Sequence, residues 1–335
     1  MNDRPLSLLD NLRFSNGPQE LKNYFREQYQ IDHNKAIELL NDQNLHFGTL
    51  YQLKSELDDK TIKSGLDKVY RKAIDIANLL SAQMQNRSAR NPESLERKLR
   101  SRDDDTNSAL RWIVGTGGLE DGFDSKYELL MERSAALLIK SHGDTTQLPA
   151  LAEMIFARNR RKALIHELVW AFFEARSPDS LLLLAQRLNS RDSRDAMLAK
   201  KLLSFIPGIG DKSVHTSISP YSWVSGWLDE NRPFLCYTGE NLHVSNKPMP
   251  YSVSASAKYL CHPVSINTGE PLMPFLPSEI KKLSAFQKLP EKRQQQLAAF
   301  SWMLYRRNIY QWNSWIRLSV NEQSALASQM MGGYQ

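Results

Sequence analysis

Two cysteines and two histidines provide the side chains best suited to hold a metal ion. Cys236, His243, Cys261 and His262 offer the thiolate and imidazole ligands that zinc prefers. Their spacing matches no standard zinc finger, and the neighbours Cys261 and His262 are awkward to place on one tetrahedral ion. We therefore predict buried free thiols and surface histidines, with no bound metal. Zinc binding by these four residues stays open as the alternative.

A second possible metal site lies in two acidic clusters, Asp-Asp-Asp at 103–105 and Glu-Asp-Gly-Phe-Asp at 120–124. Magnesium prefers oxygen ligands such as carboxylates, and the two clusters resemble the magnesium sites of isoprenoid synthases, helical enzymes that bind pyrophosphate. The clusters are too close together in the chain, however, and Gly122 would break a helix through the second one. A metal-dependent helical enzyme is therefore the third functional interpretation, and Asp103–Asp105 stays open as a metal ligand.

The turn Pro-Gly-Ile-Gly at 207–210, followed by Lys212, is suited to contact a phosphate. It is similar to the turn of a helix-hairpin-helix element, which presents backbone N–H groups to DNA. Glycine suits such a turn because a side chain would hold the phosphate away. The residues at 217–220 end any second helix early, so the favoured interpretation is a glycine that terminates the preceding helix, with DNA contact as the alternative.

Cations are concentrated in two polar elbows between predicted helices, at 158–162 and 189–194. If neighbouring helix pairs stack, both elbows reach the same edge, and their side chains form a basic ridge able to contact a phosphate backbone. Asp192 and Asp195 weaken the charge of the second elbow. The residues expected to contact a partner or nucleic acid are Arg158, Arg160, Arg161, Lys162, Arg191, Arg194, Gly208, Gly210 and Lys212.

The helices that would position these elbows follow a repeating pattern between residues 148 and 206. Short helices are predicted at 148–156 and 181–188, and each is followed by an elbow and a second helix, at 163–176 and 196–206. Such a pair has two apolar sides and cannot bury both alone, so neighbouring pairs are expected to stack. The matching positions are 33 residues apart, for example Leu151 and Leu184, Ala152 and Ala185, and Phe172 and Phe205.

This pattern resembles a HEAT or armadillo helical repeat, with residues 109–206 as the repeat domain. The resemblance implies an α-solenoid of stacked helical pairs that acts as an interaction scaffold rather than as an enzyme. An ordinary helical bundle with a coincidental period is the alternative.

The remaining chain is expected to form three further parts. Residues 1–85 are predicted to be a helical N-terminal unit, because apolar residues recur at helical spacing there. Residues 86–108 carry many charges and little to bury, which predicts a linker. Residues 207–335 are expected to combine an irregular excursion rich in proline and aromatic residues, with a small hairpin, and C-terminal helices packed on the repeats.

The C-terminal helices carry a second basic group, Arg306 and Arg307. Three aromatic residues, Tyr305, Tyr310 and Trp312, lie beside them in the sequence and could stack on bases. The favoured interpretation is a core from which the arginines reach outward, because tryptophan is costly to expose.

Composition limits the class of protein without selecting a function. The chain has 335 residues, 41% of them hydrophobic and 24% charged, which fits a globular protein. A net charge of +6 permits an acidic partner or nucleic acid without requiring either. Two cysteines form no disulfide framework, and neither a signal peptide nor a membrane-spanning stretch is evident, so the expected location is the cytoplasm.

These patterns favour a mainly α protein that binds another macromolecule, most simply another protein, and has no enzymatic activity. Nucleic-acid binding through the basic elbows and the glycine turn is the alternative. No catalytic residue, cofactor or membrane contact is expected, and the sequence does not specify an oligomeric state.

Overall fold

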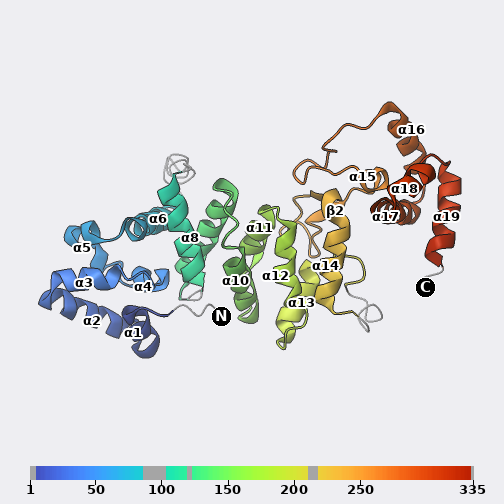
Figure 1. Ribbon diagram of the computed structural model, residues 1–335. Coiled ribbons are helices and arrows are strands. Elements are labelled where there is room, and N and C mark those ends of the chain that lie inside the picture. Colours follow the sequence, from blue (N-terminus) through green and yellow to red (C-terminus); the bar gives the residue numbers. More distant parts are fainter. Residues whose placement is uncertain (1–4, 86–102, 119–122, 210–217, 333–335) are drawn as a thin grey trace. The chain divides into compact units, whose positions relative to one another are not determined.

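The computed structural model describes residues 5–85, 103–118, 123–209 and 218–332 and is mainly helical, as predicted (Figure 1). The chain divides into two compact units, Met1–Ala175 and Arg176–Gln335. The division falls inside the segment 109–206 that the sequence pattern assigned to one repeat domain. Among the described helices, none combines the length and the apolar character that a membrane span requires.

The first unit begins with short amphipathic helices, several of which start at a polar capping side chain. Asp32 caps the third helix, because its carboxylate accepts hydrogen bonds from the backbone N–H groups of Asn34 and Lys35. Gly17, with φ of +90°, connects the first two helices in a conformation that favours glycine. The elements are α1 (Leu8–Asn16), α2 (Pro18–Ile31), α3 (His33–Leu40), α4 (Phe47–Gln52), the 3₁₀ turn η1 (Glu56–Asp58), α5 (Lys60–Gly65) and α6 (Lys68–Gln85).

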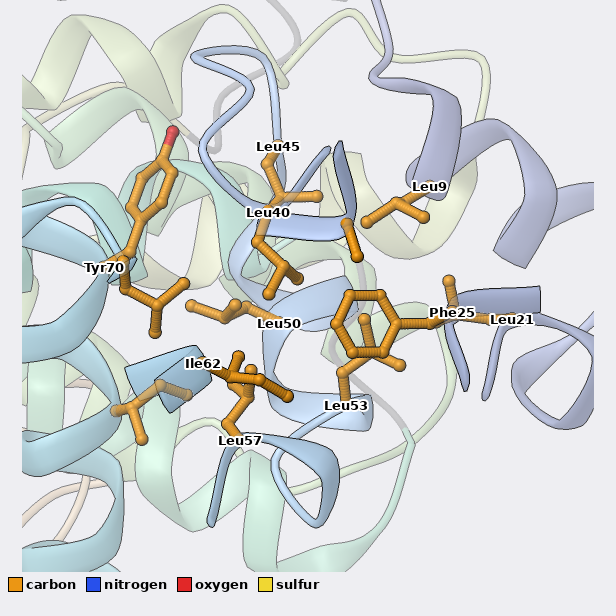
Figure 2. Packing of buried hydrophobic residues seen from close by; sticks show 13 residues of the cluster. Leu9, Leu21, Phe25, Leu40, Leu45, Leu50, Leu53, Leu57, Ile62 and Tyr70 are labelled. Atoms are coloured by element: carbon orange, nitrogen blue, oxygen red, sulfur yellow. The ribbon is translucent and has the colours of Figure 1, made fainter. Parts of the chain in front are cut away.

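Side chains from all of these helices meet in one apolar core (Figure 2). The Tyr70 hydroxyl closes one side of this core by donating to the Asp42 carbonyl at 2.8 Å. The indole N–H of Trp112 donates to the Leu45 carbonyl at 3.2 Å and so attaches the next helix, α8 (Asp104–Gly117). The predicted helical N-terminal unit therefore shares its core with residues beyond 85.

Helix α8 begins within the segment that was predicted to be a linker up to residue 108. Asp103 is its N-cap and accepts a hydrogen bond from the Thr106 backbone N–H at 2.6 Å. Lys68 forms an ion pair with Asp105 at 2.7 Å. Aspartates are favourable in a first helical turn because the helix dipole is positive there, so the acidic run starts a helix. Residues 86–102 of the predicted linker lie outside the described residues.

The last helices of the first unit are close to their predicted positions. Asp124 caps α9 (Ser125–Ala136) by accepting from the Tyr127 N–H at 2.7 Å, and a π-helical turn at Leu137–Ser141 follows. Helices α10 (Leu148–Arg160) and α11 (His166–Glu174) correspond to the predictions at 148–156 and 163–176. Helix α10 is therefore one turn longer than predicted, and α11 is shorter at both ends.

The second unit holds two further short helices and then a helix where the sequence predicted an irregular excursion. Pro220 stands in the first turn of α14, a position where its missing N–H costs nothing, and Ser219 caps this helix. Residues 220–231 of the predicted irregular excursion therefore form a regular helix. The elements are the 3₁₀ turn η4 (Pro178–Ser180), α12 (Leu181–Ala185), α13 (Ser193–Leu202), α14 (Pro220–Asn231) and the 3₁₀ turn η6 (Arg232–Phe234).

A two-stranded antiparallel sheet and the C-terminal helices complete the second unit, and the sheet confirms the predicted hairpin pairing. Tyr259 stacks on Phe286 at 4.3 Å between ring centres, and the Ser301 hydroxyl donates to the Tyr259 carbonyl at 2.6 Å. These contacts join three helices in one core. The elements are β1 (Leu235–Tyr237), β2 (Tyr251–Val253), α15 (Ala255–Leu260), α16 (Pro277–Phe286), α17 (Glu291–Arg307), α18 (Ile309–Trp315) and α19 (Val320–Gly332).

The two members of the predicted repeat belong to different units, because α10 and α11 lie in the first and α12 and α13 in the second. Phe172 is buried in the first unit, whereas Phe205 is half-buried in the second and contacts Trp227 and Tyr251. The stacking of the two pairs, and the packing of the C-terminal part on them, therefore stay predictions.

Candidate interaction surface

The structure does not bring the four candidate zinc ligands together. Within the described ranges, no three histidine, cysteine or acidic side chains form a group suited to a metal ion. The Cys236 thiol lies 3.0 Å from the Ser252 hydroxyl, and His262 Nε2 lies 3.1 Å from a Glu279 carboxylate oxygen. Burial raises the pKa of the Cys261 thiol to about 12, so this sulfur stays protonated near neutral pH.

Arg158, which was predicted to contact a partner or nucleic acid, is buried inside the first unit. Its guanidinium forms an ion pair with Glu132 and donates to the Glu128 carbonyl at 2.8 Å. The surface role predicted for Arg158 is therefore wrong. The physical reason is that α10 continues past residue 156, which places Arg158 on the same inward face as Leu151 and Ile155.

The other cations of the first elbow lie nearer to solvent. Arg161 forms an ion pair with Glu128 at 3.2 Å, and Arg160 is half-buried. Lys162 is exposed and takes a left-handed conformation, with φ of 60°. This elbow therefore presents a weaker basic surface than its sequence predicts.

The second elbow exposes Arg191 and Arg194, while its acidic residues have structural roles. Asp192 caps α13 by accepting from the Arg194 backbone N–H at 2.9 Å, and Asp195 is buried 4.0 Å from Arg187. Because the two elbows belong to different units, the continuous basic ridge stays a prediction.

Gly208 has a structural reason to be glycine. Its φ is +78°, and a Cβ atom added there would lie 3.0 Å from the Trp223 ring, whose N–H donates to the Pro207 carbonyl at 2.9 Å. The interpretation of this glycine as a helix terminator is wrong, because α13 already ends at Leu202. Gly210 and Lys212 lie outside the described residues, so the phosphate-contact interpretation of the turn stays a prediction.

The second basic group lies beside an open pocket of the second unit. Arg306 and Arg307 are exposed, and the Arg306 guanidinium lies 5.9 Å from the centre of the Trp302 ring. Trp312 donates to the Ser301 hydroxyl at 2.8 Å and packs against the core, whereas Tyr310 remains 81% exposed. The favoured interpretation, an aromatic core with outward arginines, fits this arrangement except at Tyr310. The pocket is lined by Glu230, Ala299, Phe300, Trp302, Met303, Arg306 and Arg307.

A different segment exposes several large apolar side chains within a short stretch, more than any other stretch among the described residues of the second unit. We call residues 271–277, Pro-Leu-Met-Pro-Phe-Leu-Pro, the proline segment; it leads directly into α16 (Figure 1). Leu272, Met273 and Leu276 are 66%, 64% and 61% exposed, and Ile280 on the following helix is 53% exposed. Large apolar side chains scattered singly over a surface are normal, but a contiguous group of them is typical of an interaction site.

The proline segment is held in place at three points. The Leu272 N–H donates to the Pro263 carbonyl at 2.8 Å, and the partly buried Phe275 lies 5.2 Å from the His262 ring. The Glu279 carboxylate accepts from the Leu276 N–H at 2.8 Å and contacts His262 through its other oxygen. The exposed side chains therefore project from a fixed backbone.

From the sequence, these prolines only predicted an irregular excursion, and the segment was not identified as a site. A signal was present, because Pro271, Pro274 and Pro277 are three residues apart and only apolar residues separate them. That the apolar residues face solvent, however, follows from the tertiary structure. No family model, curated protein or solved structure matches the chain.

Proposed function

We propose that this protein functions without enzymatic activity, by binding another protein through the proline segment and the adjoining Ile280. The observation that carries the proposal is the exposure of Leu272, Met273 and Leu276 within five residues. Covering one such side chain contributes about 1.5 kcal/mol. A partner that covers all three and Ile280 therefore gains about 6 kcal/mol, which is comparable to the lower estimates of the entropic cost of association, so further contacts around the segment must complete the interface.

The fixed backbone supports the same proposal. A flexible apolar segment would lose conformational freedom when a partner binds, and this loss would weaken the complex. The hydrogen bond of Leu272 to Pro263 and the packing of Phe275 have already ordered the segment. The segment also carries no charged side chain, so it suits a protein surface better than a phosphate backbone.

The proposal predicts that acidic substitutions in the proline segment remove the bound protein. We expect tagged full-length protein to capture a defined set of proteins from its native cell, and nuclease treatment to leave that set intact. The double variant Leu272→Asp/Leu276→Asp is expected to lose it, because burying a carboxylate in an apolar contact is unfavourable. Quantitative mass spectrometry of the captured proteins measures the effect.

Val244→Asp is the matched control, because Val244 is 78% exposed in a turn of the same unit and lies outside the proline segment. Val244→Asp should retain the captured set. The unmodified protein, the acidic double variant and Val244→Asp should all melt at the same temperature. Retention of the set by the double variant would contradict the proposal. Loss of the set after nuclease treatment would instead favour the nucleic-acid interpretation.

A further inference from the structure

We propose that the partner recognises the proline segment as a polyproline II helix, through a groove lined with aromatic side chains. This inference depends on the proposed function and adds the class of partner. Polyproline II ligands place apolar and proline side chains between the aromatic ridges of such grooves. The proline segment contains two apolar-proline pairs of this kind, Met273 with Pro274 and Leu276 with Pro277.

The backbone at Leu276, the residue before Pro277, has dihedral angles of the polyproline II type. Residues 274–276 form neither helix nor strand, and Leu276 has φ of −69° and ψ of 154°, close to the ideal values of about −75° and 145°. Proline fixes its own φ near −65° and keeps the preceding residue extended. Met273 and Leu276 both precede a proline, so the sequence itself favours this conformation.

From Met273 to Pro277 the exposure of the side chains follows the period of that helix, whereas Leu272, three residues before the half-buried Phe275, is exposed and precedes the turn. A polyproline II helix has three residues per turn, so residues three apart lie on the same edge. Met273 and Leu276 are both exposed, and so are Pro274 and Pro277. Phe275, the residue between the two apolar-proline pairs, is partly buried and packs on the core. The edge at Phe275 is therefore anchored, and the other two edges present Met273 with Leu276 and Pro274 with Pro277 to a partner.

Two further features favour a groove over the edge of a β-sheet. Pro274 and Pro277 have no N–H group, so the segment cannot form the continuous ladder of hydrogen bonds that an added strand needs. Lys281, four residues after Pro277 in α16, is exposed. A positive charge beside the segment suits a groove with an acidic residue at its rim.

The test measures how strongly a captured partner binds the full-length protein and a double variant, Pro274→Ala/Pro277→Ala. This variant keeps Leu272, Met273 and Leu276 but removes the ring contacts and the restricted backbone. We expect the dissociation constant of the complex between the partner and this variant to be about tenfold higher or more, because each apolar-proline pair loses its fit to the groove. Decaproline, a peptide that forms a polyproline II helix, should displace the partner from the unmodified protein. Biolayer interferometry provides both measurements.

Pro207→Ala is the control, because Pro207 is exposed in the same unit and an alanine keeps its carbonyl, which accepts from Trp223. It should bind the partner as the unmodified protein does. Where the double variant melts at a lower temperature, displacement by decaproline decides the question, since that measurement uses the unmodified chain.

The outcomes separate this inference from the proposed function. If Leu272→Asp/Leu276→Asp abolishes binding while Pro274→Ala/Pro277→Ala and decaproline have no effect, the partner contacts the apolar side chains in another conformation, and the polyproline II inference is overturned alone. If the acidic double variant also binds normally, both the polyproline II inference and the proposed function are wrong. Displacement by decaproline together with the loss in the proline variant supports both.

Discussion

Replacing Arg158 with alanine is expected to lower the free energy of unfolding by about 3–5 kcal/mol, because it removes one partner of a buried ion pair. The Arg158 side chain has no exposed surface, and the Glu132 side chain is only 14% exposed. The substitution would leave the Glu132 carboxylate without this counter-ion. It would also remove the donor to the Glu128 carbonyl, which the guanidinium contacts at 2.8 Å.

Urea unfolding followed by circular dichroism measures this change. Arg161→Ala is the matched control, because Arg161 is 41% exposed and its pair with Glu128 should contribute less than about 1 kcal/mol. Equal urea midpoints for Arg158→Ala and Arg161→Ala would show that Arg158 is not the buried structural group that the geometry indicates.

Phe172→Ala is expected to destabilise the first unit by about 3–5 kcal/mol, because it creates a cavity in the core. The Phe172 side chain is 1% exposed and packs edge-to-face on Phe173, with 5.5 Å between the ring centres. Trp170, two residues earlier on α11, is only half-buried, and the Lys140 ammonium lies 4.9 Å from the centre of its ring. Trp170→Ala should therefore lower the free energy of unfolding by less than Phe172→Ala does.

The free energies of unfolding of the two variants, determined from the same urea titration, check this order. A larger loss for Trp170→Ala than for Phe172→Ala would mean that the buried face of α11 is misassigned.

Much of the helical fold could be predicted from the sequence because helix formation depends on local features. Apolar residues at helical spacing indicated α10 and α11. The same local reasoning left open whether Asp103 and Asp124 bind a metal ion, and the structure shows that they cap α8 and α9. An aspartate at a helix start serves either role equally well in sequence, and only the position of the first helical turn separates the two.

The candidate site was less predictable because exposure is a property of the tertiary structure. Arg158 lies in a run of cations, and cations are mostly exposed, yet a longer helix and the carboxylate of Glu132 bury it. Leu272, Met273 and Leu276 are apolar, and apolar side chains are mostly buried, yet the anchoring of Phe275 turns them outward. In both places the residue type predicted the opposite environment from the one it has.

Photo-crosslinking at Leu272 tests most directly whether the proline segment is a protein-binding surface. A benzophenone amino acid replaces Leu272, which is 66% exposed and lies outside the polyproline II turn, or Val244 as the control. Illumination in the native cell, followed by mass spectrometry, identifies any covalent adduct. The proposed function predicts a defined protein adduct at position 272 that is absent at position 244. Labelling at position 272 that does not exceed the labelling at position 244 would contradict it.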